Sequence, residues 1–420
     1  MKMTKILSLI LVLVMAVGCI VACDGGNTED GGSSSKMKIT MWVSTTDGVK
    51  GQTLEQVEAF KEEMGYDFDI EIETVGEGDA GSLVLADLQT APDMYWFAQD
   101  QLPRLVLGNA LAKPGVKATE TIKANNDAES IIAATVSDTV YAYPLTSDNG
   151  YFLYYNKSIV KDPTSLEAIV AACKGAGKKI GYAVENAWIM ASFFFAQKQG
   201  TKAPICNSTW TYSEDGKNPV AHADTFNSAN GLIAMKAMSA MTTSGAWVNA
   251  DNDFSGTAAL VSGIWNYDAA VQAYGDNLGI AKLPTFTVDG QTYQLGSYKG
   301  CKLIGVKPQA DEQKAKICSE LALWLTNEEN QLERHYMFGW GPSNKEAQKD
   351  ESVMSHPALK ALAAQNEFAQ PQGVIPGDWW TPAALLGTAS YKHDGGDVNE
   401  AWFLEALAEY QKTIDGLLVK

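Results

Sequence analysis

The chain has 420 residues, of which 46% are hydrophobic and 20% are charged. This length and composition suit a globular protein of two domains with sizeable cores, and they exclude disorder for most of the chain. The formal net charge is −18, from 50 acidic and 32 basic residues. Because such a surface repels a phosphate backbone and no stripe of Lys or Arg offsets it, we expect no nucleic-acid partner.

The N-terminus has the pattern of a secretory signal. Basic residues precede an apolar run over residues 6–17, which is shorter than the roughly 20 apolar residues of a membrane-spanning helix. Two cysteines, Cys19 and Cys23, follow small and aliphatic residues, and this pattern resembles a bacterial lipoprotein signal. We predict that residues 1–22 are removed, that Cys23 is lipidated, and that residues 23–36 form a flexible linker. Cleavage without a lipid is the alternative.

Four further cysteines leave the redox state open. No two of them form a C-x-x-C pair, and the four histidines do not stand at zinc-like spacings, so we predict no metal and no cofactor. Export permits disulfides, but four cysteines allow three pairings and a large core needs none. The cysteines are Cys173, Cys206, Cys301 and Cys318.

Strands and helices alternate in the first part of the chain. Residues 38–43 predict a strand, residues 53–64 an amphipathic helix, and residues 68–74 a strand with one polar face. Further elements follow in the same order, with a helix at 82–88, a strand at 94–97 and a helix at 101–107. This alternation favours an α/β fold with a mainly parallel sheet.

Helices dominate the middle of the chain, and strands return late. Two strands between residues 139 and 156, joined through 144–150, are followed by predicted helices at 165–173, 187–199 and 227–241. A domain boundary near Thr146 fits this change. Residues 278–286 and 301–306 are strand-like and flank a hairpin turn at Asp289-Gly290. We therefore expect the chain to re-enter the first domain. The predicted helices of the tail are 311–325, 358–366, 382–389 and 398–417.

A G-x-G-x-x-G motif at Gly76, Gly78 and Gly81 lies between a strand and a helix, which is the context of a dinucleotide-binding loop. In dinucleotide folds the preceding strand is buried on both faces, whereas residues 68–74 have an acidic face. We interpret the motif as a glycine-rich turn.

Motifs of nucleophilic and metal-dependent hydrolases are absent from the sequence, which contains neither G-x-S-x-G nor H-E-x-x-H. A glycosidase needs two suitably spaced carboxylates, and a chain with 50 acidic residues leaves that possibility open.

The most informative signal is aromatic. Eleven Trp, sixteen Tyr and thirteen Phe are spread over both halves of the chain, and many stand beside a carboxylate or an amide. A pyranose presents an apolar C–H face to an aromatic ring and hydroxyls to Asp, Asn or Glu, so this pattern favours sugar binding. Core packing is the ordinary interpretation of any single aromatic. The pair Trp379-Trp380 is the exception, because adjacent bulky rings at a helix entry cannot easily face one core.

Several segments together resemble the extracellular solute-binding proteins of ATP-driven sugar importers, and among them the maltose- and maltodextrin-binding lipoproteins. The segments are Ile39-Thr40-Met41-Trp42, Ala91 to Asp100, Ala142-Tyr143-Pro144-Leu145, Tyr155-Asn156-Lys157, Gly263-Ile264-Trp265, Leu283-Pro284-Thr285-Phe286 and Gly373-Val374-Ile375-Pro376 ahead of the tryptophan pair. The resemblance runs from about Lys38 to the C-terminus.

This resemblance implies a two-lobe fold of the periplasmic-binding-protein type, with the ligand cleft between lobes joined by crossing hinge segments. The expected limits are 37–146 and 285–326 for the N-terminal lobe, and 147–284 and 327–420 for the C-terminal lobe. The resemblance also implies ligand contacts from both lobes and from the crossing segment. The implied residues are Asp47, Trp96, Phe97, Asp100, Asp148, Asn149, Asn186, Trp188, Trp265, Trp379 and Trp380.

The resulting hypothesis is a non-enzymatic, monomeric receptor, lipid-anchored on the outer face of the cell membrane. It captures malto-oligosaccharides and delivers them to the permease subunits of an ABC importer. The alternatives are a receptor for a xylo- or galacto-oligomer, a secreted glycosidase and a polysaccharide adhesin.

Overall fold

The computed structural model describes residues 36–213 and 218–419. The predicted signal, the lipidation site Cys23 and nearly all of the linker lie outside these residues.

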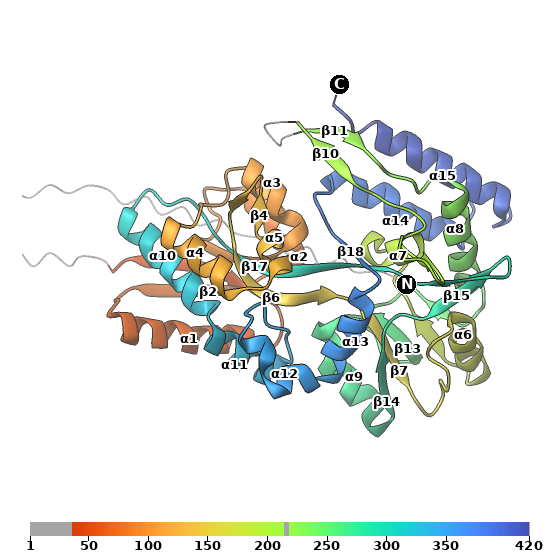
Figure 1. Cartoon of the computed structure of the whole chain (residues 1–420), viewed down its shortest axis with the longest axis horizontal. Coiled ribbons are helices and arrows are strands. Elements are labelled where there is room, and N and C mark those ends of the chain that lie inside the picture. Colours follow the sequence, from red (N-terminus) through yellow and green to blue (C-terminus); the bar gives the residue numbers. More distant parts are fainter. Residues whose placement is uncertain (1–35, 214–217, 420) are drawn as a thin grey trace, which may run out of the picture. The chain divides into compact units, whose positions relative to one another are not determined.

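The first lobe is built on a six-stranded sheet in which β1 pairs in parallel with β2 and with β3. Of its strands, Figure 1 labels β2, β6, β17 and β18. Next to β3, β17 runs antiparallel and also pairs with β6 and with β18. The strands are β1 (Lys38–Val43), β2 (Asp69–Thr74), β3 (Met94–Ala98), β6 (Tyr143–Gly150), β17 (Ser297–Val306) and β18 (Ala369–Pro371). Because β17 lies hundreds of residues after β1, the predicted return of the chain to the first domain is confirmed.

Apolar periodicity explains the core of this lobe. In β1 the side chains of Ile39, Met41 and Val43 are buried and alternate with more exposed ones. In β3, which lies inside the sheet, four successive side chains are buried, as expected for a strand covered on both faces. The helices of this part of the chain are α1 (Val49–Met64), α2 (Glu77–Ala86), α3 (Leu102–Leu107), α4 (Val116–Asn125), α5 (Ala128–Ala133) and α10 (Glu312–Leu325).

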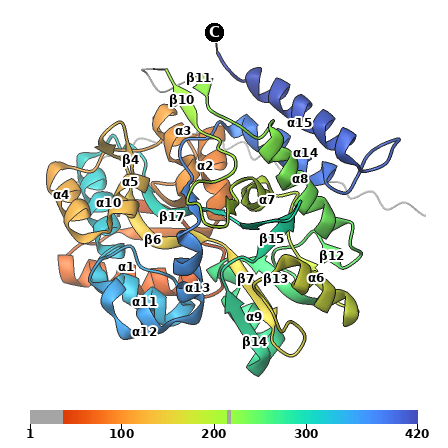
Figure 2. The same cartoon turned by 45° about the vertical axis from the view of Figure 1, so that its right-hand side comes forward.

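The second lobe is built on a five-stranded sheet with the order β12-β8-β13-β7-β14. Strands β12, β8 and β13 are parallel, and β7 is antiparallel to its neighbours β13 and β14. Figure 2 shows β7, β13 and β14 side by side near α6 and α9. The strands are β7 (Phe152–Asn156), β8 (Lys179–Gly181), β12 (Trp247–Val248), β13 (Thr257–Ser262) and β14 (Leu278–Ala281).

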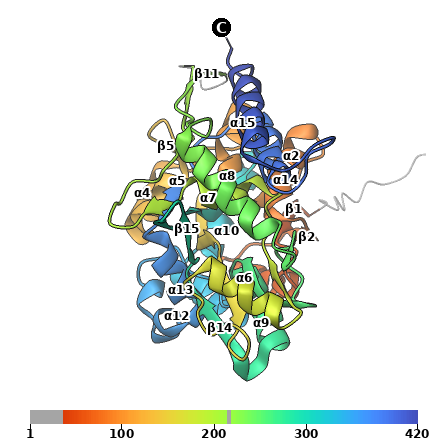
Figure 3. The same cartoon turned by 90° about the vertical axis from the view of Figure 1, so that its right-hand side faces the viewer.

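The helices of the second lobe enclose a core of their own. Figure 3 shows α8, α14 and α15 close together, and their apolar side chains share one buried cluster with α7. The helices beside the second sheet and this cluster are α6 (Leu166–Gly175), α7 (Ala187–Phe194), α8 (Ala229–Thr242), α9 (Tyr267–Tyr274), α14 (Trp380–Ala389) and α15 (Glu400–Asp415). Between α10 and α14 the chain forms α11 (Glu328–Phe338), α12 (Glu351–Ser355) and α13 (Pro357–Asn366).

The chain crosses between the two sheets at β6. A single residue, Tyr151, separates β6 in the first sheet from β7 in the second. Residues 144–150, predicted as a connection between two strands, are instead part of a strand, because they pair with β17 in the first sheet. The limits of the lobes given above remain a prediction.

A predicted hairpin joins two strands of a small third sheet. Strands β15 (Thr285–Val288) and β16 (Gln291–Gln294) are antiparallel and linked by two residues, and β9 (Gln197–Lys198) pairs with β16. Asp289 and Gly290 have φ values of 51° and 75°, the left-handed geometry that such a two-residue turn requires. The Asp289-Gly290 turn is thus confirmed.

In the described part of the chain, Cys173, Cys206, Cys301 and Cys318 are unpaired and buried. None of the helices described combines enough length and apolarity to cross a bilayer.

Candidate functional site

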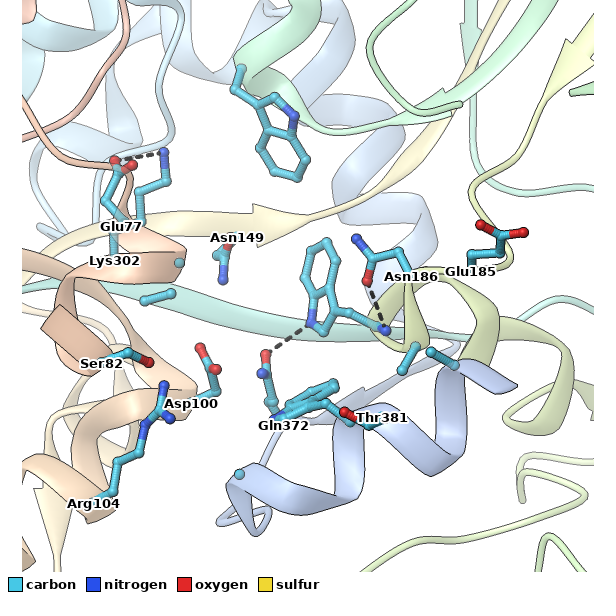
Figure 4. Close-up of a pocket in the computed structure, with 18 of the residues that line it drawn as sticks. Glu77, Ser82, Asp100, Arg104, Asn149, Glu185, Asn186, Lys302, Gln372 and Thr381 are labelled. Carbon is cyan, nitrogen blue, oxygen red and sulfur yellow. Dashed lines mark hydrogen bonds and ion pairs between the residues drawn. The ribbon is translucent and has the colours of Figure 1, made fainter. Parts of the chain in front are cut away.

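The candidate site is a cavity of about 1060 Å³ that both lobes line (Figure 4). The loops at the carboxyl ends of parallel strands build much of it, which is the usual location of ligand sites in α/β sheets. In the first lobe Ser44 to Thr46 follow β1, and Asp100 follows β3. In the second lobe Asn186 follows β8, and Trp265 follows β13.

Hydroxyl, amide, acidic and basic side chains line this cavity beside tryptophan rings. The lining residues are Ser44, Thr45, Thr46, Glu77, Gly78, Ser82, Ala98, Asp100, Arg104, Asn149, Glu185, Asn186, Ala187, Trp188, Trp265, Lys302, Gln372, Gly377, Trp380, Thr381, Ala384, Leu385 and Thr388.

Three partly exposed tryptophans supply the aromatic surface. The rings of Trp188 and Trp265 lie 6.2 Å apart and are tilted by 40°. The third, Trp380, packs edge-on against the buried ring of Trp379, at 5.0 Å and 82°. Each ring is therefore held by neighbours while one part of it remains accessible from the cavity.

Hydrogen bonds fix the position of Trp188. The side chain of Asn186 caps α7 and accepts a hydrogen bond from the Trp188 backbone N–H at 3.0 Å. The indole N–H of Trp188 donates to Oε1 of Gln372 at 2.9 Å, and Figure 4 shows both bonds. The helix cap thus fixes the backbone of Trp188, and Gln372 orients its ring.

Charged groups line the opposite side of the cavity, on the first lobe. Burial raises the pKa of Asp100 to about 6, and the nearby guanidinium of Arg104 opposes this shift. Lys302 Nζ lies 3.2 Å from Glu77 Oε1 in an ion pair that is nearly buried, and it also lies 4.5 Å from the centre of the Trp340 ring. The cavity therefore offers a carboxyl group of raised pKa and a nearly buried ion pair.

Six of the eleven residues predicted as ligand contacts come together in this cavity. They are Asp100, Asn149, Asn186, Trp188, Trp265 and Trp380.

The other five predicted residues do not line it. Trp96 and Phe97 are fully buried in the first core, because β3 is covered on both faces. Trp379 is fully buried in the second core, where its indole N–H donates to the hydroxyl of Tyr410 at 2.7 Å.

The last two, Asp148 and Asp47, are each adjacent in sequence to a residue that lines the cavity. Asp148 is 1% exposed and lines a separate cavity of about 130 Å³, whereas Asn149 lines both this cavity and the main one. Asp47 is exposed, one residue beyond the lining segment that ends at Thr46.

Sequence reasoning missed several lining residues. On α14, Trp380, Ala384 and Thr388 recur at intervals of four residues, a helical periodicity that the sequence contains. The pairing of Glu77 with Lys302 joins positions far apart in the chain and has no local signal.

The glycine-rich motif at Gly76 to Gly81 is part of the cavity wall, and it forms the start of α2. The β2 strand before it is at the edge of the sheet, unlike the central strand of a dinucleotide fold. A side chain at Gly81 would meet Oε1 and Cβ of Gln101, and this same oxygen accepts the Gly81 N–H. A larger residue at position 81 would therefore have to displace the Gln101 side chain.

The described residues contain no group of three or more His, Cys, Asp and Glu side chains arranged to hold a metal ion. The polar side chains and tryptophan rings that line the cavity offer hydrogen bonds and ring faces to a ligand, which suits a polar organic molecule.

Comparison with known families decides the class of this protein. Residues 55–361 match the model of the bacterial extracellular solute-binding proteins. The chain belongs to that family. Its members are binding proteins, and the two-lobe fold described above is theirs.

Known proteins similar to this solute-binding protein cover almost its whole length. The galactooligosaccharide-binding protein of Bacillus subtilis (strain 168) is 26% identical over 431 residues, which cover 94% of each chain. A solved structure with acarbose is 25% identical, with a TM-score of 0.77 over 91% of this chain and 99% of the other. The maltodextrin-binding protein MalE1 from L. casei BL23, solved without ligand, is 24% identical, with a TM-score of 0.73 over 90% and 99%.

Proposed function

We propose that this solute-binding protein is a monomeric receptor that captures malto-oligosaccharides for import by an ABC transporter. The observation that carries the proposal is the set of three partly exposed tryptophans, Trp188, Trp265 and Trp380, lining one cavity together with carboxylates and amides. Ring faces stack on the C–H faces of pyranoses, and the polar groups accept and donate to the hydroxyls. The six predicted residues in the cavity are the proposed ligand contacts.

The similarity to a structure solved with acarbose, together with the sequence resemblance to maltodextrin-binding proteins, supports an α-glucan ligand. The name of the B. subtilis relative favours a second candidate, a galacto-oligosaccharide. Both ligands are chains of pyranoses, so they use the same aromatic and polar groups.

Calorimetric titration with maltotriose, maltoheptaose and a galacto-oligosaccharide series tests the assignment. We expect α-glucans to bind with micromolar affinity, about −8 kcal/mol, and to change the intrinsic tryptophan fluorescence. Binding of galacto-oligosaccharides alone would replace the first candidate by the second. No binding of either series would refute a sugar receptor of this kind.

A receptor without catalytic activity should leave its ligand intact. After incubation of the protein with maltoheptaose, we expect chromatography to recover the heptasaccharide unchanged. Release of shorter glucans by the purified protein, and not by a variant such as Asp100→Asn, would indicate a glycosidase instead.

Attachment through Cys23 is the proposed means of keeping the receptor at the membrane, beside the permease. Intact-mass analysis of membrane-extracted protein should give a chain that begins at Cys23 and carries a lipid. A lipid on Cys19, or a lipid-free chain that starts at Cys23, would contradict this proposal.

A further inference from the structure

The cavity follows one face of α14. Its lining residues on this helix are Trp380, Thr381, Ala384, Leu385 and Thr388. The helical turn continues past the end of α14, because the backbone N–H of Tyr391 donates to the carbonyl oxygen of Thr388 at 3.2 Å. Tyr391 is therefore the next residue on this face, and at about 1.5 Å per residue it stands about 16 Å from Trp380 along the helix.

The order of the parallel strands leads to the same place. Going outward through the second sheet, β13 is followed by β8 and then by β12 at the edge. The residues after β13 and β8 include Trp265 and Glu185, which line the cavity, and Asn249 follows β12 directly. Because the carboxyl ends of parallel strands meet at one edge, the row of ligand-facing loops continues to Asn249. Figure 4 shows Glu185 at the end of the cavity remote from Glu77 and Lys302.

Hydrogen bonds make a rigid unit of the residues at this outer end. The carboxylate of Glu185 accepts from the hydroxyl of Tyr391 and from Nδ2 of Asn249, the latter at 3.1 Å. The Glu185 backbone N–H donates to Oδ1 of Asn249, also at 3.1 Å. Burial and the bond to Glu185 raise the pKa of Tyr391 to about 12, so its hydroxyl remains a donor at physiological pH.

Two aromatic rings stand beside this carboxylate. The ring of Trp247 lies 4.9 Å from that of Tyr391 at an angle of 50°, and its indole N–H donates to the carbonyl oxygen of Tyr182 at 2.8 Å. Both rings are partly exposed. Glu185 lines the outer end of the cavity, and the rings of Trp247 and Tyr391 stand just beyond it. This carboxylate and these two rings repeat the combination of groups found inside the cavity.

From this arrangement we infer that Trp247, Tyr391 and Glu185 form an additional sugar subsite, which binds the units of an oligosaccharide chain that extend beyond the cavity. The inference rests on the proposed function and adds to it a preference for longer chains. The rings supply a stacking surface, and Glu185, with both oxygens already fixed, accepts hydrogen bonds from sugar hydroxyls through its remaining lone pairs.

The test compares a short and a long ligand. Trp247→Leu and Tyr391→Phe are titrated with maltotriose and maltoheptaose, and with galactobiose and galactotetraose if the second candidate ligand binds. We expect Trp247→Leu to weaken the binding of the longer chain about tenfold, which corresponds to about 1.4 kcal/mol, and to leave the shorter one unchanged. Tyr391→Phe, which keeps the ring, should weaken the longer chain by a smaller factor.

A matched control separates loss of the subsite from loss of the fold. Trp402 also donates its indole N–H to a backbone carbonyl oxygen and packs on a ring, that of His393 at 4.0 Å, but it does not line the cavity. Trp402→Leu should change neither affinity, and melting temperatures of all variants are measured alongside. Equal losses for both chain lengths, or none, in folded Trp247→Leu would refute the subsite while the proposed function stands. A wild-type protein that binds no chain of either series overturns both.

Discussion

Replacement of Trp380 by alanine should remove ligand affinity and leave the fold stable, whereas the same change at Trp379 should do the reverse. The two residues are adjacent and chemically identical, so each is the control for the other. Trp380 lines the cavity and is partly exposed. Trp379 is fully buried, and its indole N–H donates to Tyr410, whose hydroxyl in turn donates to Asp224 at 2.6 Å.

The expected magnitudes follow from these environments. Loss of an aromatic ring that stacks on a ligand costs about 2 kcal/mol of binding, which is about thirtyfold in affinity. Removal of the buried Trp379 side chain costs about 3–5 kcal/mol of the free energy of unfolding, because it leaves a cavity and deprives Tyr410 of a partner. For Trp380→Ala we expect a change in unfolding free energy of about 1 kcal/mol or less, as for a partly exposed side chain.

The assay combines calorimetric titration with maltotriose and urea unfolding of the ligand-free protein. A large loss of stability in Trp380→Ala with unchanged affinity would refute the assignment of this ring to the ligand. If the affinity loss appeared at Trp379 and the stability loss at Trp380, the two roles would have to be exchanged.

Four further outcomes are expected. Burial raises the pKa of Asp100 to about 6 in the folded state, so between about pH 4 and pH 6 the folded state holds a proton that the unfolded state has released. The contribution of Asp100 to the free energy of unfolding therefore falls as the pH rises through this range and is constant above it. Ligand affinity should fall between pH 7.5 and pH 5, since an ionised carboxylate accepts a sugar hydroxyl more strongly than a neutral acid, and Asp100→Asn should abolish this pH dependence in titrations. Lys302→Met should cost about 3–5 kcal/mol in urea unfolding, because it leaves the carboxylate of Glu77 nearly buried without its partner; a cost below about 1 kcal/mol would show that the pair is solvated. Burial raises the pKa of all four described thiols, so a thiol reagent should label a chain that starts at Asp24 only after denaturation, and then at four positions; fewer than four would indicate a disulfide.

Local patterns in the sequence predicted the parts of the fold that depend on apolar periodicity and turn chemistry. The limits of β1 at Lys38 and Val43 and the turn at Asp289-Gly290 are confirmed, because each depends on residues within a few positions. Helix α11 (Glu328–Phe338) was not predicted. Its buried side chains are Asn330, Gln331, Arg334 and His335, so its inner face carries no apolar pattern.

In the candidate site, too, some residues could be predicted from local sequence and others depend on tertiary structure. Trp265 and Trp380 belong to short segments that resemble a known family, Asn186 and Trp188 were implied by the same resemblance, and all four line the cavity. Sequence could not separate Trp380 from Trp379, or Asn149 from Asp148. A shift of one position reverses the direction of a side chain in a strand and turns it by about 100° in a helix, so neighbours in sequence can face different surroundings. Contacts such as Glu77 with Lys302 depend on tertiary structure alone.

The position of β17 constrains how the protein is made. This strand lies between β3 and β18 and also holds β6, yet its residues are 297–306. A nascent chain that ends before residue 306 therefore lacks the strand that holds its first sheet together, although β1, β2 and β3 have already been synthesised. The first sheet therefore cannot be completed before residue 306 has been synthesised, and β18 joins it only after residue 371. A contiguous N-terminal fragment that ends before β17 should not yield the lobe as an independent product, since the contacts that complete it are distant in sequence.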